Sequence, residues 1–173
     1  MLAIRNKILL FLLACCFIGN AAAADKDGSY TLYLIRHAEK QADGSRDPAL
    51  TEIGKNRSEQ LAVWLQDKNI TEIWSSDYKR TRDTAKPLAT GLGLELTIYD
   101  PRNLPDLVEK LAHNQSTALI VGHSNTTPEL ARLLCDCSVA DMDESEYDRL
   151  IVISISNTET RVRTLQQNHL LQP

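Results

Sequence analysis

The sequence lacks the marks of several protein classes. It has no excess of positive charge, because 19 basic residues stand against 23 acidic ones for a net charge of −4, and this balance argues against nucleic acid as a partner. No second Cys or His pair stands at zinc spacing, and no P-C-x-x-C follows the H-x-E triplet at 37–39. Internal repeats and low-complexity segments are missing as well. The expectation is a single folded domain that needs no metal or other cofactor.

A long membrane-spanning run is also missing. The apolar stretch Ile8 to Gly19 has about a dozen residues, fewer than the roughly 20 that cross a bilayer as a helix. It follows Arg5 and Lys7, and it precedes the small residues at 22–24, which is the pattern of a secretory signal peptide.

This pattern predicts a signal peptide at 1–24 and one domain at 25–173. The protein is then expected to be exported, to the periplasm or the extracellular space, without a transmembrane segment after signal removal. An alternative takes Leu12 to Cys15 as a lipoprotein signal with a lipid on Cys15. Removal of 1–24 leaves 17 basic and 23 acidic residues, a net charge of −6. Because such a molecule repels anions as a whole, an anionic substrate needs a locally cationic pocket.

Apolar patterning alternates between strand and helix along the remaining chain. Strands are predicted at about 30–36, 70–75, 94–98 and 117–121, with a closing pair at 150–155 and 160–165. Helices are predicted at about 51–67, 78–91, 104–113 and 126–134, the first capped by Thr51 and the last by Thr126 or Thr127. This order predicts an α/β domain with a mainly parallel sheet covered on both faces.

Finer features of these elements carry further expectations. Gly54 is a poor helix former in the first turn of its helix, which indicates a close backbone approach. The inner helix faces are expected to carry Ile53, Leu61, Trp64 and Leu65, and Leu130, Leu133 and Leu134. The acidic segment 141–148 is expected to be a solvated loop, and Cys135 and Cys137 are either bridged or two free thiols.

Two predicted strands end in histidine, at Arg36-His37 and at Gly122-His123. Residues just past neighbouring parallel strands lie at one edge of a sheet, which is where ligands bind in open α/β folds. The second strand leads to a helix start that carries Arg80. Imidazoles and guanidiniums gathered there suit a phosphate dianion. A neutral imidazole can attack phosphorus while arginines neutralise the transferring group.

Four motifs in order make the chain similar to the histidine phosphatase superfamily, also called phosphoglycerate mutase-like. They are Leu34 to Lys40 with its R-H-A-E core, Leu50-Thr51-x-x-Gly54, Ser76-x-x-x-Arg80-Thr81-x-Asp83-Thr84-Ala85, and Val121-Gly122-His123-Ser124. The resemblance covers about residues 30–134. It implies a three-layer α/β/α sandwich and cofactor-free chemistry in which His37 becomes a phosphohistidine. It also implies a phosphate pocket made by Arg36, Arg80 and His123, with Glu39 in a supporting role.

The proton donor is less well marked. Family members with a strong general acid usually carry it in a longer segment after the third strand, and this segment is short here. Asp100 is the candidate acid because it stands at a strand end, with Asp106 and Glu109 as rivals. Ser124 and Asn125 either cap the following helix or touch phosphate through it.

The expected function is an exported phosphatase that hydrolyses phosphomonoesters. Its substrate would be a phosphorylated small molecule or a surface-glycan phosphate. The alternatives are a protein phosphohistidine phosphatase, which needs no strong acid, and a non-catalytic phosphate- or phosphoglycan-binding protein.

Overall fold

The computed structural model describes residues 28–170. The strands are β1 (Tyr30–Arg36), β2 (Glu72–Ser76), β3 (Leu96–Tyr99), β4 (Ala118–Gly122), β5 (Arg149–Ile155) and β6 (Thr160–Gln166). The helices are α1 (Glu52–Leu65), α2 (Lys79–Leu92), α3 (Leu104–Asn114), α4 (Thr126–Cys135) and α5 (Gln167–Leu170). The predicted signal peptide and the alternative lipid site at Cys15 lie outside the described residues. None of the helices within 28–170 is long and apolar enough to cross a membrane.

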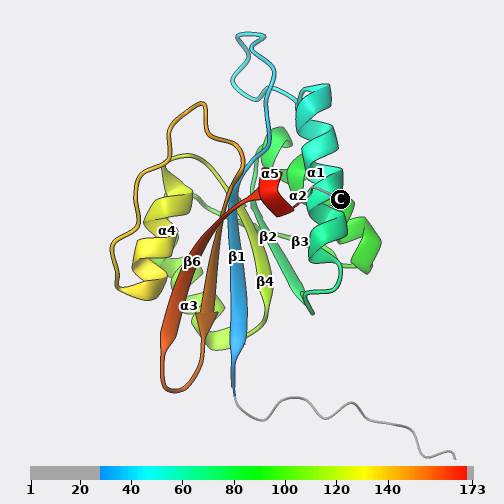
Figure 1. Ribbon diagram of the computed structural model, residues 1–173. Coiled ribbons are helices and arrows are strands. Elements are labelled where there is room, and N and C mark those ends of the chain that lie inside the picture. The colour runs from blue at the N-terminus through cyan, green and yellow to red at the C-terminus, as the bar shows by residue number, and fades with distance from the viewer. Residues whose placement is uncertain (1–27, 171–173) are drawn as a thin grey trace, which may run out of the picture.

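One six-stranded sheet forms the centre of the molecule, in the order β3-β2-β4-β1-β5-β6 (Figure 1). Strands β1 to β4 pair in parallel, whereas β5 is antiparallel to both β1 and β6. Arg36 at the end of β1 stands opposite Gly122 at the end of β4. The carboxyl ends of β1, β2 and β4 therefore meet at one edge of the sheet.

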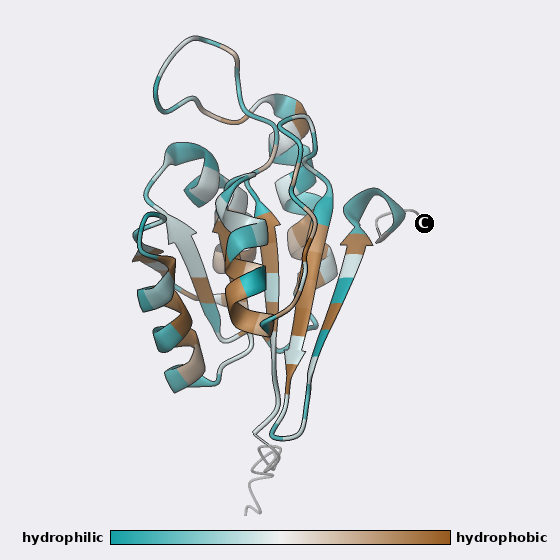
Figure 2. Cartoon of the chain, turned by 90° about the vertical axis from the view of Figure 1, so that its left-hand side faces the viewer, coloured by the Kyte–Doolittle hydropathy of each residue, from teal (hydrophilic) through white to brown (hydrophobic). Residues whose placement is uncertain are grey.

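Helices cover both faces of this sheet (Figure 1). One core cluster joins the sheet to α1 and α2 through Leu61, Leu65 and Leu88. A second cluster, on the other face, joins it to α3 and α4 through Leu107 and Leu130. Figure 2 shows the apolar strands between these helices. The predicted three-layer sandwich is confirmed, with a mixed sheet in which the parallel strands predominate.

Two residues expected on inner helix faces point outward instead. Ile53 is 68% exposed and Leu133 is 46% exposed. In α1 the buried positions are 54, 58, 61 and 65, so the inward stripe passes through Gly54, and its neighbour Ile53 is turned about 100° away. In α4, Leu133 lies about 60° around the helix from the buried Leu130 and about 160° from the buried Ala131.

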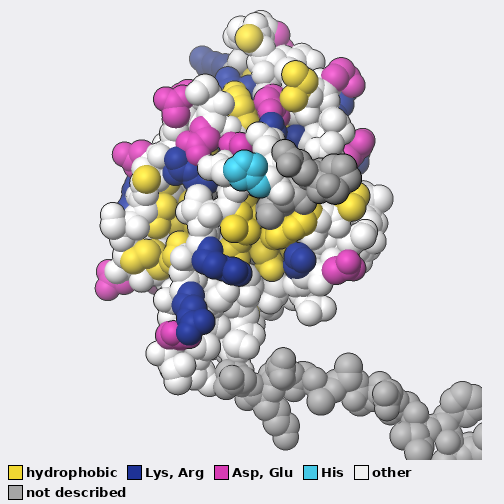
Figure 3. Space-filling model, viewed as in Figure 1, with side chains coloured by type: hydrophobic (Ala, Val, Ile, Leu, Met, Phe, Trp, Pro, Cys, Tyr) yellow, Lys and Arg dark blue, Asp and Glu magenta, His cyan; other side chains and the backbone are white. Residues whose placement is uncertain are grey.

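The surface carries both signs of charge, and basic and acidic side chains are interspersed on the face seen in Figure 3. At the end of α4 the two cysteines are bridged, with Cα atoms 5.1 Å apart, so the disulfide alternative holds.

Candidate active site

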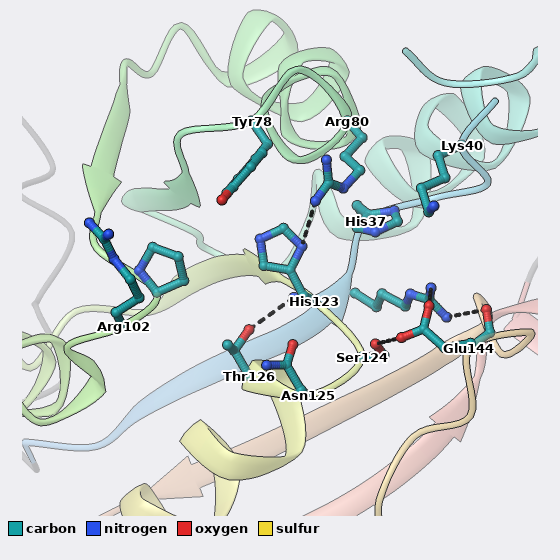
Figure 4. Close-up of a pocket in the computed structure, with 12 residues that line it drawn as sticks. His37, Lys40, Tyr78, Arg80, Arg102, His123, Ser124, Asn125, Thr126 and Glu144 are labelled. Carbon is teal, nitrogen blue, oxygen red and sulfur yellow. Dashed lines mark hydrogen bonds and ion pairs between the residues drawn. The ribbon is translucent and has the colours of Figure 1, made fainter. Parts of the chain in front are cut away.

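A cavity of about 380 Å³ opens at the carboxyl edge of the sheet (Figure 4). It is lined from the ends of β1, β2 and β4 and from two loops. The lining residues are Arg36, His37, Lys40, Tyr78, Arg80, Pro101, Arg102, His123, Ser124, Asn125, Thr126 and Glu144.

His37 follows β1 and is 2% exposed. Its backbone N–H donates to the Gly122 carbonyl at 3.0 Å, which holds it against β4. Its Nδ1 lies 2.8 Å from the Ala38 carbonyl oxygen. Because a carbonyl only accepts, Nδ1 carries the proton and Nε2 keeps its lone pair. Burial lowers the pKa of His37 to about 3, helped by nearby Arg36 and opposed by the Ala38 hydrogen bond, so the ring is neutral at neutral pH.

His123 follows β4, and its ring centroid is 5.6 Å from that of His37. Its Nδ1 lies 3.5 Å from Arg80 Nη2, and because a guanidinium only donates, Nδ1 is the acceptor. Nε2–H then donates to Ser76 Oγ at 2.9 Å. Burial, followed by Arg80 and Arg36, lowers the pKa of His123 to about 4, while Glu144 acts in the opposite direction. Arg80 of α2 thus sets the tautomer of His123, and Ser76 at the end of β2 accepts from the remaining ring N–H.

The turn between β4 and α4 is too tight for a side chain at Gly122. A Cβ there would lie 2.9 Å from the Tyr99 hydroxyl and 3.0 Å from the hydroxyl oxygens of Thr126 and Thr127. Thr126 Oγ1 accepts from the His123 N–H at 3.0 Å. The helix begins at Thr126 with Asn125 as its N-cap residue. The cap predicted at Thr126 or Thr127 is therefore wrong, whereas the expectation of a cap at Ser124 or Asn125 holds for the position of Asn125, whose side chain makes no capping hydrogen bond. The hydroxyl of Thr126 accepts from the His123 N–H, and that of Thr127 donates to the Ile35 carbonyl.

Arg80, in the first turn of α2, is held with its charge toward His123. Its Cζ lies 4.4 Å from the centre of the Tyr78 ring, and its Nη1 lies 3.6 Å from Asp47 Oδ1. Nevertheless Nε and Nη1 are buried and make no hydrogen bond with any part of the chain that the structure describes.

Arg36 is buried in a cage made by the segment 141–148. Its Nη1 donates to the carbonyl oxygens of Asp143, Glu144 and Glu146 at 3.0, 2.7 and 3.1 Å. Its Cζ lies 4.2 Å from the centre of the Tyr147 ring. The expectation of a merely solvated acidic loop is therefore wrong, because the backbone of this segment satisfies a buried cation.

Glu39 does not line the cavity. Its carboxylate accepts from Arg57 of α1 in a two-pronged ion pair, with oxygen to nitrogen distances of 2.7 to 3.0 Å. Its carbonyl accepts from the Thr51 N–H at 2.9 Å, and Thr51 in turn caps α1. The contacts of Glu39 thus fasten the loop after His37 to α1, which agrees with a supporting role.

A family model described as "Histidine phosphatase superfamily (branch 1)" matches residues 32–109 of this chain. Residues 32–109, a little under half of the chain, thus carry the sequence pattern of the histidine phosphatase superfamily. Its curated relatives include proteins named "Probable phosphoglycerate mutase GpmB" from Yersinia pestis (strain Pestoides F) and Yersinia pseudotuberculosis serotype O:1b (strain IP 31758). Each is 39% identical over 77 residues, which are 41% of this chain and 35% of the relative. The match thus spans about a third of the length of these relatives.

Solved structures share the fold. The protein histidine phosphatase SixA, complexed with tungstate, matches with a TM-score of 0.66 and 16% identity over 81% of this chain and 99% of that one. A mycobacterial glucosyl-3-phosphoglycerate phosphatase matches with a TM-score of 0.64 and 16% identity over 81% of this chain and 99% of that one. At this identity the likeness concerns the histidine phosphatase fold alone.

Most of the predicted site residues converge on the cavity. Arg36, His37, Arg80, His123, Ser124 and Asn125 all line it. Asp100 does not, because its carboxylate pairs with Arg102, with 3.0 Å between Oδ1 and Nε, beside a neighbouring hollow. The rivals Asp106 and Glu109 lie on α3 and do not line the cavity either.

Sequence reasoning missed five lining residues, Lys40, Tyr78, Pro101, Arg102 and Glu144. Lys40 and Tyr78 lie within the spans of matched motifs, which is a signal that could have found them. Glu144 had no such signal, since it lies in an acidic run without periodicity. Among residues 28–170, no group of three or more His, Cys, Asp or Glu side chains could hold a metal ion.

Proposed function

We propose that this protein is an exported phosphatase that hydrolyses phosphomonoesters through a phosphohistidine on His37. The substrate class is a phosphorylated small molecule or a phosphate on a surface glycan. Arg36, Arg80 and His123 bind the phosphate, with Ser124 and Asn125 at its edge. The proposal includes removal of residues 1–24 as a signal peptide, so that 25–173 is the working domain.

The observation that carries this proposal is a set of buried cationic N–H groups without acceptors. Arg36 Nε, Arg80 Nε and Arg80 Nη1 are buried and make no hydrogen bond within the described residues. A buried donor without a partner is costly, and more so when it is charged. Since both guanidiniums line the cavity that also contains the two imidazoles, an oxyanion bound there would satisfy them.

The site suits nucleophilic transfer of the bound phosphoryl group. His37 Nε2 attacks phosphorus with its lone pair, and the P–O bond of the ester breaks. Arg36, Arg80 and the second imidazole neutralise charge on the phosphoryl oxygens as the group moves. Water then attacks phosphorus, the P–N bond breaks, and inorganic phosphate leaves. The hydrogen bond from Nδ1 to Ala38 keeps the required tautomer throughout.

The comparisons support hydrolysis more than transfer between substrates. The structural neighbours SixA and glucosyl-3-phosphoglycerate phosphatase are both named as phosphatases. The relatives named as mutases match over only a third of their length.

A quench experiment tests the proposal. The full chain is incubated with an aryl phosphate and with an alkyl phosphate, and phosphate on His37 is then sought as an acid-labile, alkali-stable adduct. We expect turnover of both esters with the adduct, and neither in His37→Ala. Binding of phosphate analogues without turnover beyond that of His37→Ala would instead support the binding-protein alternative. N-terminal sequencing of the protein recovered from the exported fraction should begin at Asp25, whereas a lipid on Cys15 would support the lipoprotein alternative.

Protein phosphohistidine phosphatase is the second candidate. The likeness to SixA favours it, as does the segment after β3, which places Arg102 but no carboxylate at the cavity. A kcat/KM for a phosphohistidine protein that exceeds the value for every monoester tried would decide for this candidate.

A further inference from the structure

Cleavage of an alkyl phosphate requires a proton for the departing oxygen. The carboxylates predicted for this task lie elsewhere, since Asp100, Asp106 and Glu109 do not line the cavity. Of the twelve lining residues, Glu144 is the one that carries a carboxyl group. It comes from the segment 141–148, after α4, and not from the segment after β3.

Glu144 holds two of the donors expected to bind phosphate. Its Oε2 lies 2.9 Å from Arg36 Nη2, and its Oε1 accepts from Ser124 Oγ (Figure 4). The carboxylate therefore stands in the place that two substrate oxygens would take. When phosphate binds to these donors, the carboxylate must move aside.

The attachment of Glu144 allows a short movement only. Its carbonyl oxygen accepts from Arg36 Nη1 at 2.7 Å, which fixes the backbone at the rim of the cavity. Its side chain is 78% exposed and can rotate about this fixed point. A displaced carboxyl would thus remain next to the bound phosphate.

We propose that Glu144 donates the proton to the leaving oxygen, an inference that rests on the proposed phosphatase activity. The ester can arrive as a monoanion beside an ionised Glu144, or as a dianion beside a protonated one. Both complexes contain the same number of protons. Because Glu144 and the phosphate are adjacent acids, they share a single proton.

The charges around Glu144 change in the required direction. In the protein without substrate, its hydrogen bond from Ser124 and the charges of Arg36 and Lys40 lower the pKa of Glu144. Bound phosphate takes the Ser124 and Arg36 donors and adds negative charge at close range. Both changes raise the pKa of Glu144 and favour its acid form. His123, the other titratable group that interacts with Glu144, is neutral.

The proton balance closes over both steps. As the N–P bond forms and the P–O bond breaks, the carboxyl proton of Glu144 moves to the ester oxygen, and an alcohol leaves. In the second step the carboxylate takes a proton from the attacking water while the P–N bond breaks. His37 is again neutral, and one proton is again shared by Glu144 and phosphate.

The test compares leaving groups in Glu144→Gln, made in the full chain. The substrates are a nitrophenyl phosphate, whose phenolate departs without a proton, and a simple alkyl phosphate. We expect kcat for the alkyl ester to fall by about 10²- to 10⁴-fold, the usual contribution of general acid catalysis, with kcat for the nitrophenyl ester nearly unchanged. The alkaline decline of the alkyl pH–rate profile should disappear in the variant. The matched control is Asp141→Asn, in the same segment but paired with Arg132, and it should behave as wild type.

The outcomes separate this inference from the proposed function. An equal loss on both esters would overturn the inference and make Glu144 a support for Arg36. No loss, with tighter binding of inorganic phosphate, would also overturn it, because Glu144 would then only compete with the ligand. If wild type turned over neither ester, the phosphatase proposal itself would fail, and the inference with it.

Discussion

Replacing Gly54 by Ala tests how α1 positions the loop that carries His37, the proposed nucleophile. A Cβ built at Gly54 would lie 2.3 Å from the carbonyl oxygen of Glu39 and 2.9 Å from its nitrogen. Both are backbone atoms, so the loop that carries His37 and Glu39 must move by about 1 Å to restore ordinary contact. That carbonyl accepts from the Thr51 N–H at 2.9 Å and from its hydroxyl at 3.3 Å, and the movement strains both bonds.

The expected cost can be built from these contacts. Overpacking costs about 1–3 kcal/mol, and weakening two hydrogen bonds costs about 1 kcal/mol each. Alanine returns about 1 kcal/mol through its better helix propensity. We therefore expect Gly54→Ala to lower the free energy of unfolding by about 2–4 kcal/mol. A displacement of about 1 Å near the nucleophile should also reduce kcat by about 10²-fold.

Urea unfolding and turnover of an aryl phosphate measure the two effects, and Gly91→Ala is the matched control. Gly91 is also helical, in α2, but an added Cβ there meets nothing within 4 Å. This control should gain about 0.5–1 kcal/mol and keep full activity. If Gly54→Ala were as stable and as active as Gly91→Ala, the close approach of α1 to the Glu39 backbone would not govern the site.

Two further predictions concern the titration of His37 and the role of Asp100. The pKa of His37 falls from 6.5 to about 3 on folding, so the unfolded chain binds the proton first as pH drops, and stability is lost between these values. At pH 5 the free energy of unfolding is lower by about 2 kcal/mol than at pH 8 because of His37. Urea unfolding should therefore show a difference between pH 8 and pH 5 that is larger by this amount in wild type than in His37→Gln. Parallel pH curves for the two proteins would contradict the prediction. Asp100→Asn should leave kcat unchanged for alkyl and aryl esters alike, since the carboxylate of Asp100 does not line the cavity. A selective loss on alkyl esters would make Asp100 the acid in place of Glu144.

The sequence predicted what strand order and short motifs determine. Arg36 ends β1, and His37 and His123 follow β1 and β4. The parallel pairing of these two strands brings the three residues together, independently of the conformation of the loops. The close backbone approach at Gly54 was also predicted correctly. Glycine is a poor helix former, so its place in the first turn of a helix indicates a contact that leaves no room for a side chain.

The sequence could not predict the side-chain contacts made by loop residues after a strand or helix ends. Asp100 stands at a strand end, but its carboxylate pairs with Arg102, two residues later, and does not line the cavity. Glu144 lies 108 positions from Arg36, and no local pattern indicates that its segment folds back onto that cation. Contacts of this range depend on the packed tertiary structure and not on periodicity.

The cage around Arg36 has a consequence for mutational mapping of this protein. Three of its contacts are carbonyl oxygens of Asp143, Glu144 and Glu146, which every amino acid possesses. An alanine scan of the segment would keep all three carbonyls and would record only what the side chains add. Removing or inserting one residue would instead shift the carbonyls out of register with the guanidinium. The length of this segment, more than its composition, therefore keeps Arg36 in place.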